Sequence, residues 1–154
     1  MNEQTTLFLG PEENLAILKG IFSSRKTSAE DIAKVTGKNK GTILNAIHDL
    51  RVLCLIDEKL NPFDEAKHIV YDRDSKKVLK KMFTSVSGHK EAIDEINSKE
   101  EINALEVGKV FCFHTNARAS KESSIKQIGR LYLRWLKYLG LIENKEGEIK
   151  ENGH

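Results

Sequence analysis

The sequence predicts a mainly helical protein with short β elements, built from two similar units. Apolar residues recur at three- and four-residue spacing through most of the chain, which is typical of amphipathic helices. Capping residues and glycines divide these stretches into helices of ordinary length. Two sequences of the first half also have counterparts in the second: ILKGIFSS (17–24) resembles VLKKMFTS (78–85), and LCLIDEK (53–59) resembles LGLIENK (139–145).

The first helix is expected directly after Pro11, because the N–H that proline lacks would have no partner in the first turn of a helix. Its apolar face consists of Leu15, Leu18, Ile21 and Phe22. Residues 23–26 are then expected to form a turn.

Two further helices and two short strands complete the first half. Thr27 or Ser28 caps a short helix, Glu30 or Asp31 closes a capping box, and Gly37 ends it. The apolar positions of this short helix are Ala29, Ile32, Ala33 and Val35. A third helix spans about residues 39–53, and its buried stripe is Ile43, Ile47, Leu50 and Cys54. The stretches LCLIDE and HIVYD then favour strands on either side of a loop with Asn61 and Pro62.

The order of these elements is that of a winged helix-turn-helix. SAEDIAKVTGKNKGTILNAIHDLRVLCLIDE (28–58) closely resembles the helix-turn-helix stretch of winged-helix regulators of the MarR and ArsR types. The resemblance covers about residues 11–74 and implies a DNA-binding domain whose third helix enters the major groove. The wing departs from the family pattern, since no Arg or Lys pair flanks a glycine turn there and the local charges are acidic: Asp57, Glu58, Asp64 and Glu65.

The internal repeats predict a tandem winged helix-turn-helix protein, with one unit in residues 1–74 and another in 75–154. The second unit would contain an inserted helical segment at about 98–120, in which KVFCFH fits a helix and a strand equally well. Its last helix would run from about Ser123 to Gly140, followed by a short LIE strand. Beyond it, residues near Gly147 fit either a small wing or a frayed end.

Basic residues are concentrated in the second half. Up to Asp74 there are ten Lys and Arg against twelve Asp and Glu, and after it fifteen against eleven. Between Lys109 and Tyr138 only Glu122 opposes seven basic residues, a distribution that indicates a polyanionic partner. These are Lys109, Arg118, Lys121, Lys126, Arg130, Arg134 and Lys137. A solvated helix face is the alternative interpretation.

Both units have candidate DNA-contacting residues. In the second unit these are Lys126, Gln127, Arg130 and Arg134. Arginine can bind guanine through two hydrogen bonds, and glutamine can bind adenine in the same way. In the first unit the candidates are Lys38, Asn39, Lys40, Thr42 and Asn45, with Asp49 further along the same face. There the lysines would bind phosphates, Asn45 would read adenine and Thr42 would contact a thymine methyl.

Catalytic and metal-binding patterns are absent from the sequence. HExxH, CxxC, GxxxxGK[ST] and GxSxG do not occur, so neither an enzyme nor a cofactor is expected. Cys112 and His114 alone do not make a zinc site. We expect Cys112 and Cys54 to be free buried thiols and His114 to be a polar rim residue. A reducing, cytoplasmic compartment is expected, because no export signal and no membrane-length apolar run is seen.

The function that these observations favour is sequence-selective binding of double-stranded DNA, by a small transcriptional regulator or a DNA-recognition module. The alternative is a winged-helix protein–protein adaptor that does not bind DNA. The last helix is apolar over a wide arc, so we also expect it to be covered by its own domain and by a neighbour, either the first unit or a second subunit. Its apolar residues are Tyr132, Leu133, Trp135, Leu136 and Leu139.

Overall fold

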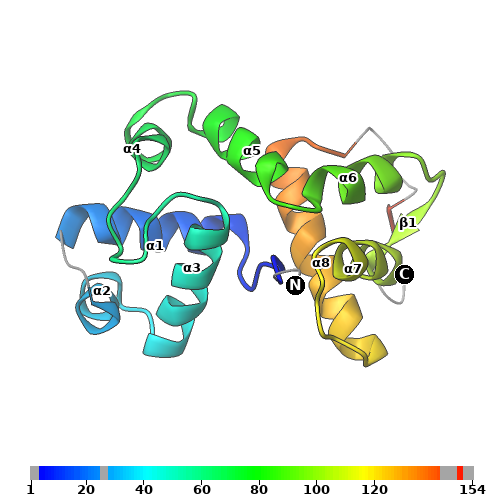
Figure 1. Ribbon diagram of the computed structural model, residues 1–154, viewed down its shortest axis with the longest axis horizontal. Helices are drawn as coiled ribbons and strands as arrows, with labels where there is room; N and C mark the ends of the chain where they lie inside the picture. Colours follow the sequence, from blue (N-terminus) through cyan, green and yellow to red (C-terminus); the bar gives the residue numbers. More distant parts are fainter. Residues whose placement is uncertain (1–3, 25–27, 143–148, 151–154) are drawn as a thin grey trace. The chain divides into compact units, whose positions relative to one another are not determined.

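The computed structural model describes residues 4–24, 28–142 and 149–150, and within them the protein is mainly helical, as the sequence predicts (Figure 1). The elements are α1 (Pro11–Ser24), α2 (Ala29–Thr36), α3 (Lys40–Val52), α4 (Asp64–Tyr71), α5 (Ser75–Ser85), α6 (His89–Asn97), β1 (Ile102–Asn103), α7 (Ala104–His114), α8 (Glu122–Leu139) and β2 (Ile149–Lys150). No helix among these residues is both long and apolar enough to cross a membrane.

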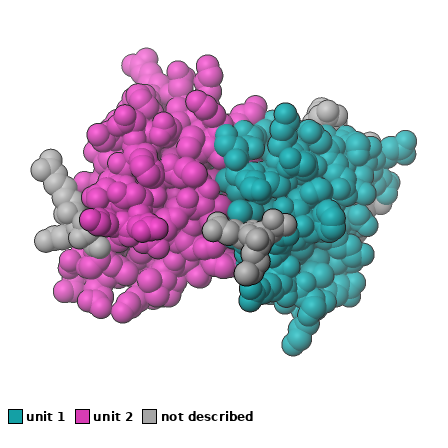
Figure 2. Space-filling model, viewed as in Figure 1, with its two compact units in different colours: residues 1–6, 84–154 teal, residues 7–83 magenta. Residues whose placement is uncertain are grey.

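The chain forms two compact units (Figure 2). One comprises residues 7–83 and is called the α1–α5 unit; the other comprises residues 1–6 and 84–154 and is called the α6–α8 unit. The division falls within α5, whereas the sequence places the boundary at residues 74 and 75, immediately before this helix.

In the α1–α5 unit, α1, α2 and α3 pack around one apolar core (Figure 1). Its fully buried side chains include Ile17, Leu18, Ile32, Ile43 and Leu50. The exposures of Leu15, Phe22 and Val35 differ from the prediction: the two α1 residues are partly exposed, and Val35 of α2 is 51% exposed.

Helix α2, with the caps at its two ends, is the best-predicted part of this unit. The Ser28 hydroxyl accepts a hydrogen bond from the Asp31 N–H (3.1 Å) and donates one to the Asp31 carboxylate (2.9 Å). Gly37 ends α2 with φ 73°, a left-handed conformation that glycine adopts at little cost, and its N–H binds the Ala33 carbonyl. Thr27 and residues 25–26 of the predicted turn lie outside the described residues, and Ser23 and Ser24 belong to α1.

The prediction for Cys54 is wrong. This residue is exposed and adopts a left-handed conformation with φ 58°, directly after α3 and its C-cap Leu53. The chain reverses there, so Leu53 and Leu55 are buried while the cysteine between them faces solvent. The prediction extended the helical spacing of the buried stripe past Val52, where α3 ends, and so placed Cys54 on the buried side.

The two predicted strands are also wrong. LCLIDE forms a loop with a single antiparallel bridge between Ile56 and Pro62, and the Asp57 carboxylate accepts hydrogen bonds from the Lys59 and Asn61 N–H groups (2.8 Å each). HIVYD lies at the end of α4, whose Ala66 and Ile69 are buried. Packing of this amphipathic helix outweighs the strand preference of its Ile-Val-Tyr sequence, because β-propensity depends strongly on tertiary context.

In the α6–α8 unit, α7 packs along α8 and also contacts α6. KVFCFH forms the last part of α7, and the predicted inserted segment is part of the core, since Val107 and Phe111 are buried. Strand β1 pairs in parallel with β2, Ile102 opposite Ile149. Leu141 and Ile142 are not part of a strand, and Glu143 and the region of the expected wing lie outside the described residues.

Two glycines allow α7 and α8 to approach closely. A Cβ on Gly129 would meet the carbonyl oxygen of Ala104, and a Cβ on Gly108 would meet that of Ile125. Since these neighbours are backbone atoms of the facing helix, no side-chain rotation could make room for a methyl group. Glycine at both positions therefore sets the distance between the two helices.

Ile47→Asp is expected to unfold the α1–α5 unit. Ile47 is 6% exposed within α3, and an unpaired buried carboxylate costs several kcal/mol, a large part of a typical stability of about 5–15 kcal/mol. Hydrogen exchange of peptides from α1–α3 measures the effect, with the exposed Asn45→Asp as the matched control. Unchanged protection in the Ile47 variant would contradict the assignment of this residue to the core.

Candidate nucleic-acid interface

One face of α8 is buried and the opposite face is basic. Helix α8 ends at Gly140, which caps it with φ 66°. The aromatic and leucine residues of its apolar face are all buried within the chain, at 0% exposure for Tyr132 and Trp135, so this face is covered without a second copy of the chain. Ser123, Gln127, Arg130, Arg134 and Lys137 are exposed, and Lys126 is partly exposed.

These polar positions form a single stripe. Ser123, Gln127, Arg130, Arg134 and Lys137 follow one another at alternating spacings of four and three residues, which keeps them on one side of an α-helix, and Lys126 lies beside Gln127. From Ser123 to Leu139 the helix has no Asp or Glu. Among the described residues, no carboxylate lies within 4.0 Å of the Lys126 or Arg134 side-chain nitrogens. The stripe of residues 123–137 is called the α8 basic face, and at Lys126 and Arg134 it presents positive charge that no described carboxylate neutralises within 4.0 Å.

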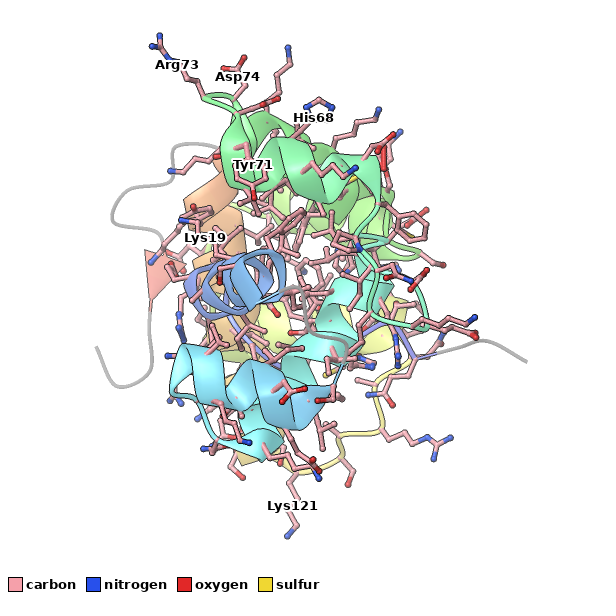
Figure 3. All side chains as sticks on the ribbon, turned by 90° about the vertical axis from the view of Figure 1, so that its left-hand side faces the viewer. Lys19, His68, Tyr71, Arg73, Asp74 and Lys121 are labelled. Atoms are coloured by element: carbon pink, nitrogen blue, oxygen red, sulfur yellow. The ribbon has the colours of Figure 1, made fainter. Side chains whose placement is uncertain are left out.

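Other basic residues belong to the same unit. Lys109 of α7 is exposed, as are Arg118 and Lys121 in the loop before α8. Figure 3 shows Lys121 pointing away from the protein into solvent. Glu122 is the acidic residue of the first turn of α8, where the positive end of the helix macrodipole stabilises a negative charge.

The lysines at the start of α3 differ from those of α8 because they bind carboxylates of their own unit. Lys38 Nζ lies 3.3 Å from Glu13 Oε1, and Lys40 Nζ lies 3.3 Å from Glu30 Oε1. A phosphate would have to compete with these carboxylates. The two lysines are therefore weaker candidates for phosphate binding than Lys126 and Arg134.

The remaining predicted residues of α3 are divided between structural and exposed positions. The Asn39 Oδ1 atom accepts a hydrogen bond from the Thr42 N–H (2.8 Å), so Asn39 is the N-cap of α3. Thr42 is partly buried, while Asn45 is exposed. The neighbouring Leu44 is 51% exposed, as is Val35 on α2, and the surface of these two helices thus includes exposed apolar side chains.

Asp49 does not lie on the exposed face of α3, and that prediction is wrong. Its side chain is buried, and its carboxylate accepts hydrogen bonds from the Phe8 N–H, the Leu9 N–H (both 2.8 Å) and the Asn14 amide (3.0 Å). Burial raises the pKa of Asp49 to about 6, although these hydrogen bonds oppose the shift. Its backbone partners are about 40 residues away in sequence, so no local pattern could identify them.

The candidate thiol and imidazole groups do not form a metal site in the described part of the chain. Cys112 is buried, which raises the pKa of its thiol, and His114 Nε2 lies 3.0 Å from Glu95 Oε1 at the edge of α6 and α7. No sequence pattern points to His89, which is fully buried with Nε2 3.3 Å from the Tyr132 hydroxyl. No three His, Cys, Asp or Glu side chains are placed to bind one metal ion within the described residues.

No protein-family model, no curated protein and no solved structure matches this chain. The similarity of residues 28–58 to winged-helix regulators stays a prediction from the sequence. The chemistry of α8 and α3 is therefore the basis on which a function can be argued.

Proposed function

We propose that this protein binds double-stranded DNA selectively, with α8 as its main DNA-contacting helix, as a small transcriptional regulator or a DNA-recognition module. The observation that supports this most is the α8 basic face, where arginine, lysine and glutamine alternate without a carboxylate. An α-helix fits the major groove of B-DNA, and its exposed side chains then reach base edges and phosphates.

Each residue of this face has a role that follows from its chemistry. The planar guanidinium of Arg130 can donate two hydrogen bonds to guanine, and the amide of Gln127 can donate to and accept from adenine in the major groove. Lys126 and Arg134 lie one turn to either side of Arg130, where they would bind phosphates and fix the position of the helix. Phosphate binding releases counterions, so affinity would fall steeply with salt.

The α2–α3 pair would be a second, weaker DNA contact if the α1–α5 unit is a winged helix-turn-helix. Support for that fold comes from three packed helices, the tight turn at residues 37–39 and the Ile56–Pro62 bridge in the place of a wing. Asn45 is the exposed residue with the chemistry for base reading there.

A protein-binding role of the α1–α5 unit is the alternative, and specific observations favour it over DNA binding by α3. Lys38 and Lys40 already bind carboxylates, and Leu44 and Val35 are half exposed on α3 and α2. Apolar side chains exposed in this way fit a protein partner better than a phosphate backbone. Affinity for such a partner would respond little to salt.

The double variant Arg130→Ala, Arg134→Ala is expected to weaken duplex binding by about 2–6 kcal/mol, because each DNA-contacting arginine contributes about 1–3 kcal/mol. Fluorescence anisotropy of labelled duplexes over a range of salt concentrations measures the effect. Arg130→Ala alone should relax the preference at one base position if Arg130 reads guanine. It should instead lower the salt slope by about one if Arg130 binds phosphate only.

Lys19→Ala, Lys90→Ala is the matched control, since it removes two exposed charges from helices that also contain carboxylates, α1 and α6. We expect this control to bind nearly as well as the wild type. A folded arginine double variant that keeps wild-type affinity would contradict the role of α8. Absence of any duplex binding by the wild type at low salt would contradict the proposed function and favour the adaptor.

A further inference from the structure

A second basic surface lies on α5, outside the residues discussed above. This helix has the sequence SKKVLKKMFTS, with four lysines and no Asp or Glu. Leu79 and Phe83 are buried, and all four lysines are exposed. They are Lys76, Lys77, Lys80 and Lys81, and the stripe that they form is called the α5 lysine face. Because residues four apart are neighbours on a helix, these lysines share one side.

This arrangement is unfavourable for the helix itself. Lys76 and Lys80, and likewise Lys77 and Lys81, are like charges at i and i+4, which destabilise a helix. Lys76 and Lys77 also lie in the first turn, where the positive end of the helix macrodipole disfavours a cation. A polyanion bound along this face would relieve both kinds of repulsion.

Two of the four lysines of the α5 lysine face have no carboxylate close by among the described residues. Among the described residues, no carboxylate lies within 4.0 Å of the Lys77 or Lys80 ammonium, whereas Lys67 of α4 has Asp64 at 3.7 Å. Asp72, before the helix, is 2.6 Å from His68. Arg73 and Asp74 precede α5 and point into solvent (Figure 3). Residues 72–81 thus contain five basic residues and two acidic ones, Asp72 and Asp74.

We propose that the α5 lysine face binds the phosphate backbone of the same DNA duplex, as a sequence-independent contact of the α1–α5 unit. This inference rests on the proposed function. Lysine ammonium groups act as point charges and lack the planar geometry of arginine or glutamine, so they favour phosphates over base edges. The α8 basic face then determines sequence preference, and α5 contributes affinity to every sequence equally.

The test is the variant Lys77→Ala, Lys80→Ala, measured by anisotropy on two labelled duplexes of unrelated sequence. Loss of two phosphate contacts should lower the slope of log affinity against log salt by about two and weaken binding roughly 10- to 100-fold at about 50 mM salt. The loss should be the same for both duplexes. Lys19→Ala, Lys90→Ala is again the control with the same change in charge.

The possible outcomes separate the two proposals. If the wild type and the α8 variant behave as proposed but the α5 variant keeps the wild-type affinity and slope, the α5 inference is wrong and the proposed function stands. A loss that differs between the two duplexes would also overturn it, because a phosphate contact does not read sequence. Wild-type protein that fails to bind either duplex would overturn both. Loss of binding to phosphatidylserine vesicles with unchanged DNA binding would assign α5 to a lipid surface instead.

Discussion

Gly129→Ala should destabilise the α6–α8 unit by about 1–2 kcal/mol, even though alanine is usually about 1 kcal/mol better than glycine inside a helix. Two effects of opposite sign compete at this position. Helix propensity favours the added methyl group, and the close approach of α7 opposes it. The surroundings of Gly129 decide which is larger.

The clash is the larger effect because it involves backbone. A Cβ at Gly129 would meet the carbonyl oxygen and carbon of Ala104, and the Gly108 nitrogen at 2.9 Å. None of these atoms can rotate away as the end of a side chain could. Helix α7 would have to move outward, and the stacking of Phe111 on Tyr132, with ring centroids 3.9 Å apart, would be disturbed.

Fluorescence of Trp135 measures this effect directly. It is the single tryptophan of the chain, and it is fully buried in α8, so its emission during urea denaturation reports on the α6–α8 unit. Gly41→Ala is the matched control, since a Cβ there meets only Asn39 Oδ1 at 3.4 Å and should be neutral or slightly stabilising. Because Gly41 lies in the α1–α5 unit, the control is followed by far-UV circular dichroism instead. A Gly129 variant as stable as the wild type would show that α7 and α8 are not so close.

Local signals allowed much of the fold to be predicted. Ser28 and Gly37 cap the two ends of α2 by hydrogen bonds to residues no more than four positions away in the sequence. The amphipathic pattern of α8 is continuous over the whole helix. The position of the α8 basic face follows from the same periodicity. These features depend on residues close together in the chain, which is why the sequence pattern contains them.

The errors arise where distant residues decide the structure. Asp49 is buried because backbone N–H groups of residues 8 and 9 reach it, and HIVYD is helical because α4 has an apolar face that packs against α1. Cys54 faces solvent because the chain adopts a left-handed turn after α3. The α5 lysines are four of the fifteen basic residues after Asp74, but a count of charges does not show that they share one face of a helix.

Asp49→Ala is expected to destabilise the α1–α5 unit by about 2–4 kcal/mol at about pH 5. The substitution leaves the part-buried N–H groups of Phe8 and Leu9 without their acceptor, and each unsatisfied donor costs about 1–3 kcal/mol. The Asn14 amide loses its bond to Asp49 but keeps the Leu9 and Gly10 carbonyls as acceptors. Collapse of the site and entry of water would offset part of this sum. Hydrogen exchange of the Phe8 and Leu9 amides would show the loss at the bonds themselves, and Asp64→Ala on the exposed start of α4 is the control.

The cost of this variant should shrink as the pH rises, and the sign follows from the raised pKa. Burial raises the pKa of Asp49 from 3.8 to about 6, so the folded state favours the protonated carboxyl. The stability that this preference contributes is fully present below pH 3.8 and is lost as the pH rises through about 6. The whole shift corresponds to about 3 kcal/mol, since one pKa unit is about 1.4 kcal/mol.

Wild-type protein should therefore lose stability between about pH 4 and pH 7, while Asp49→Ala and the non-ionising Asp49→Asn should lack this part of the pH dependence. Far-UV circular dichroism during urea denaturation at several pH values measures the difference. Parallel pH profiles for the wild type and both variants would contradict the buried carboxylate. Profiles of the wild type and the variants that converge as the pH rises would support the proposed role of Asp49. Its carboxyl group would then hold residues 8 and 9 against α3 more strongly in acid than at neutral pH, because the ionised form is poorly solvated at this buried position.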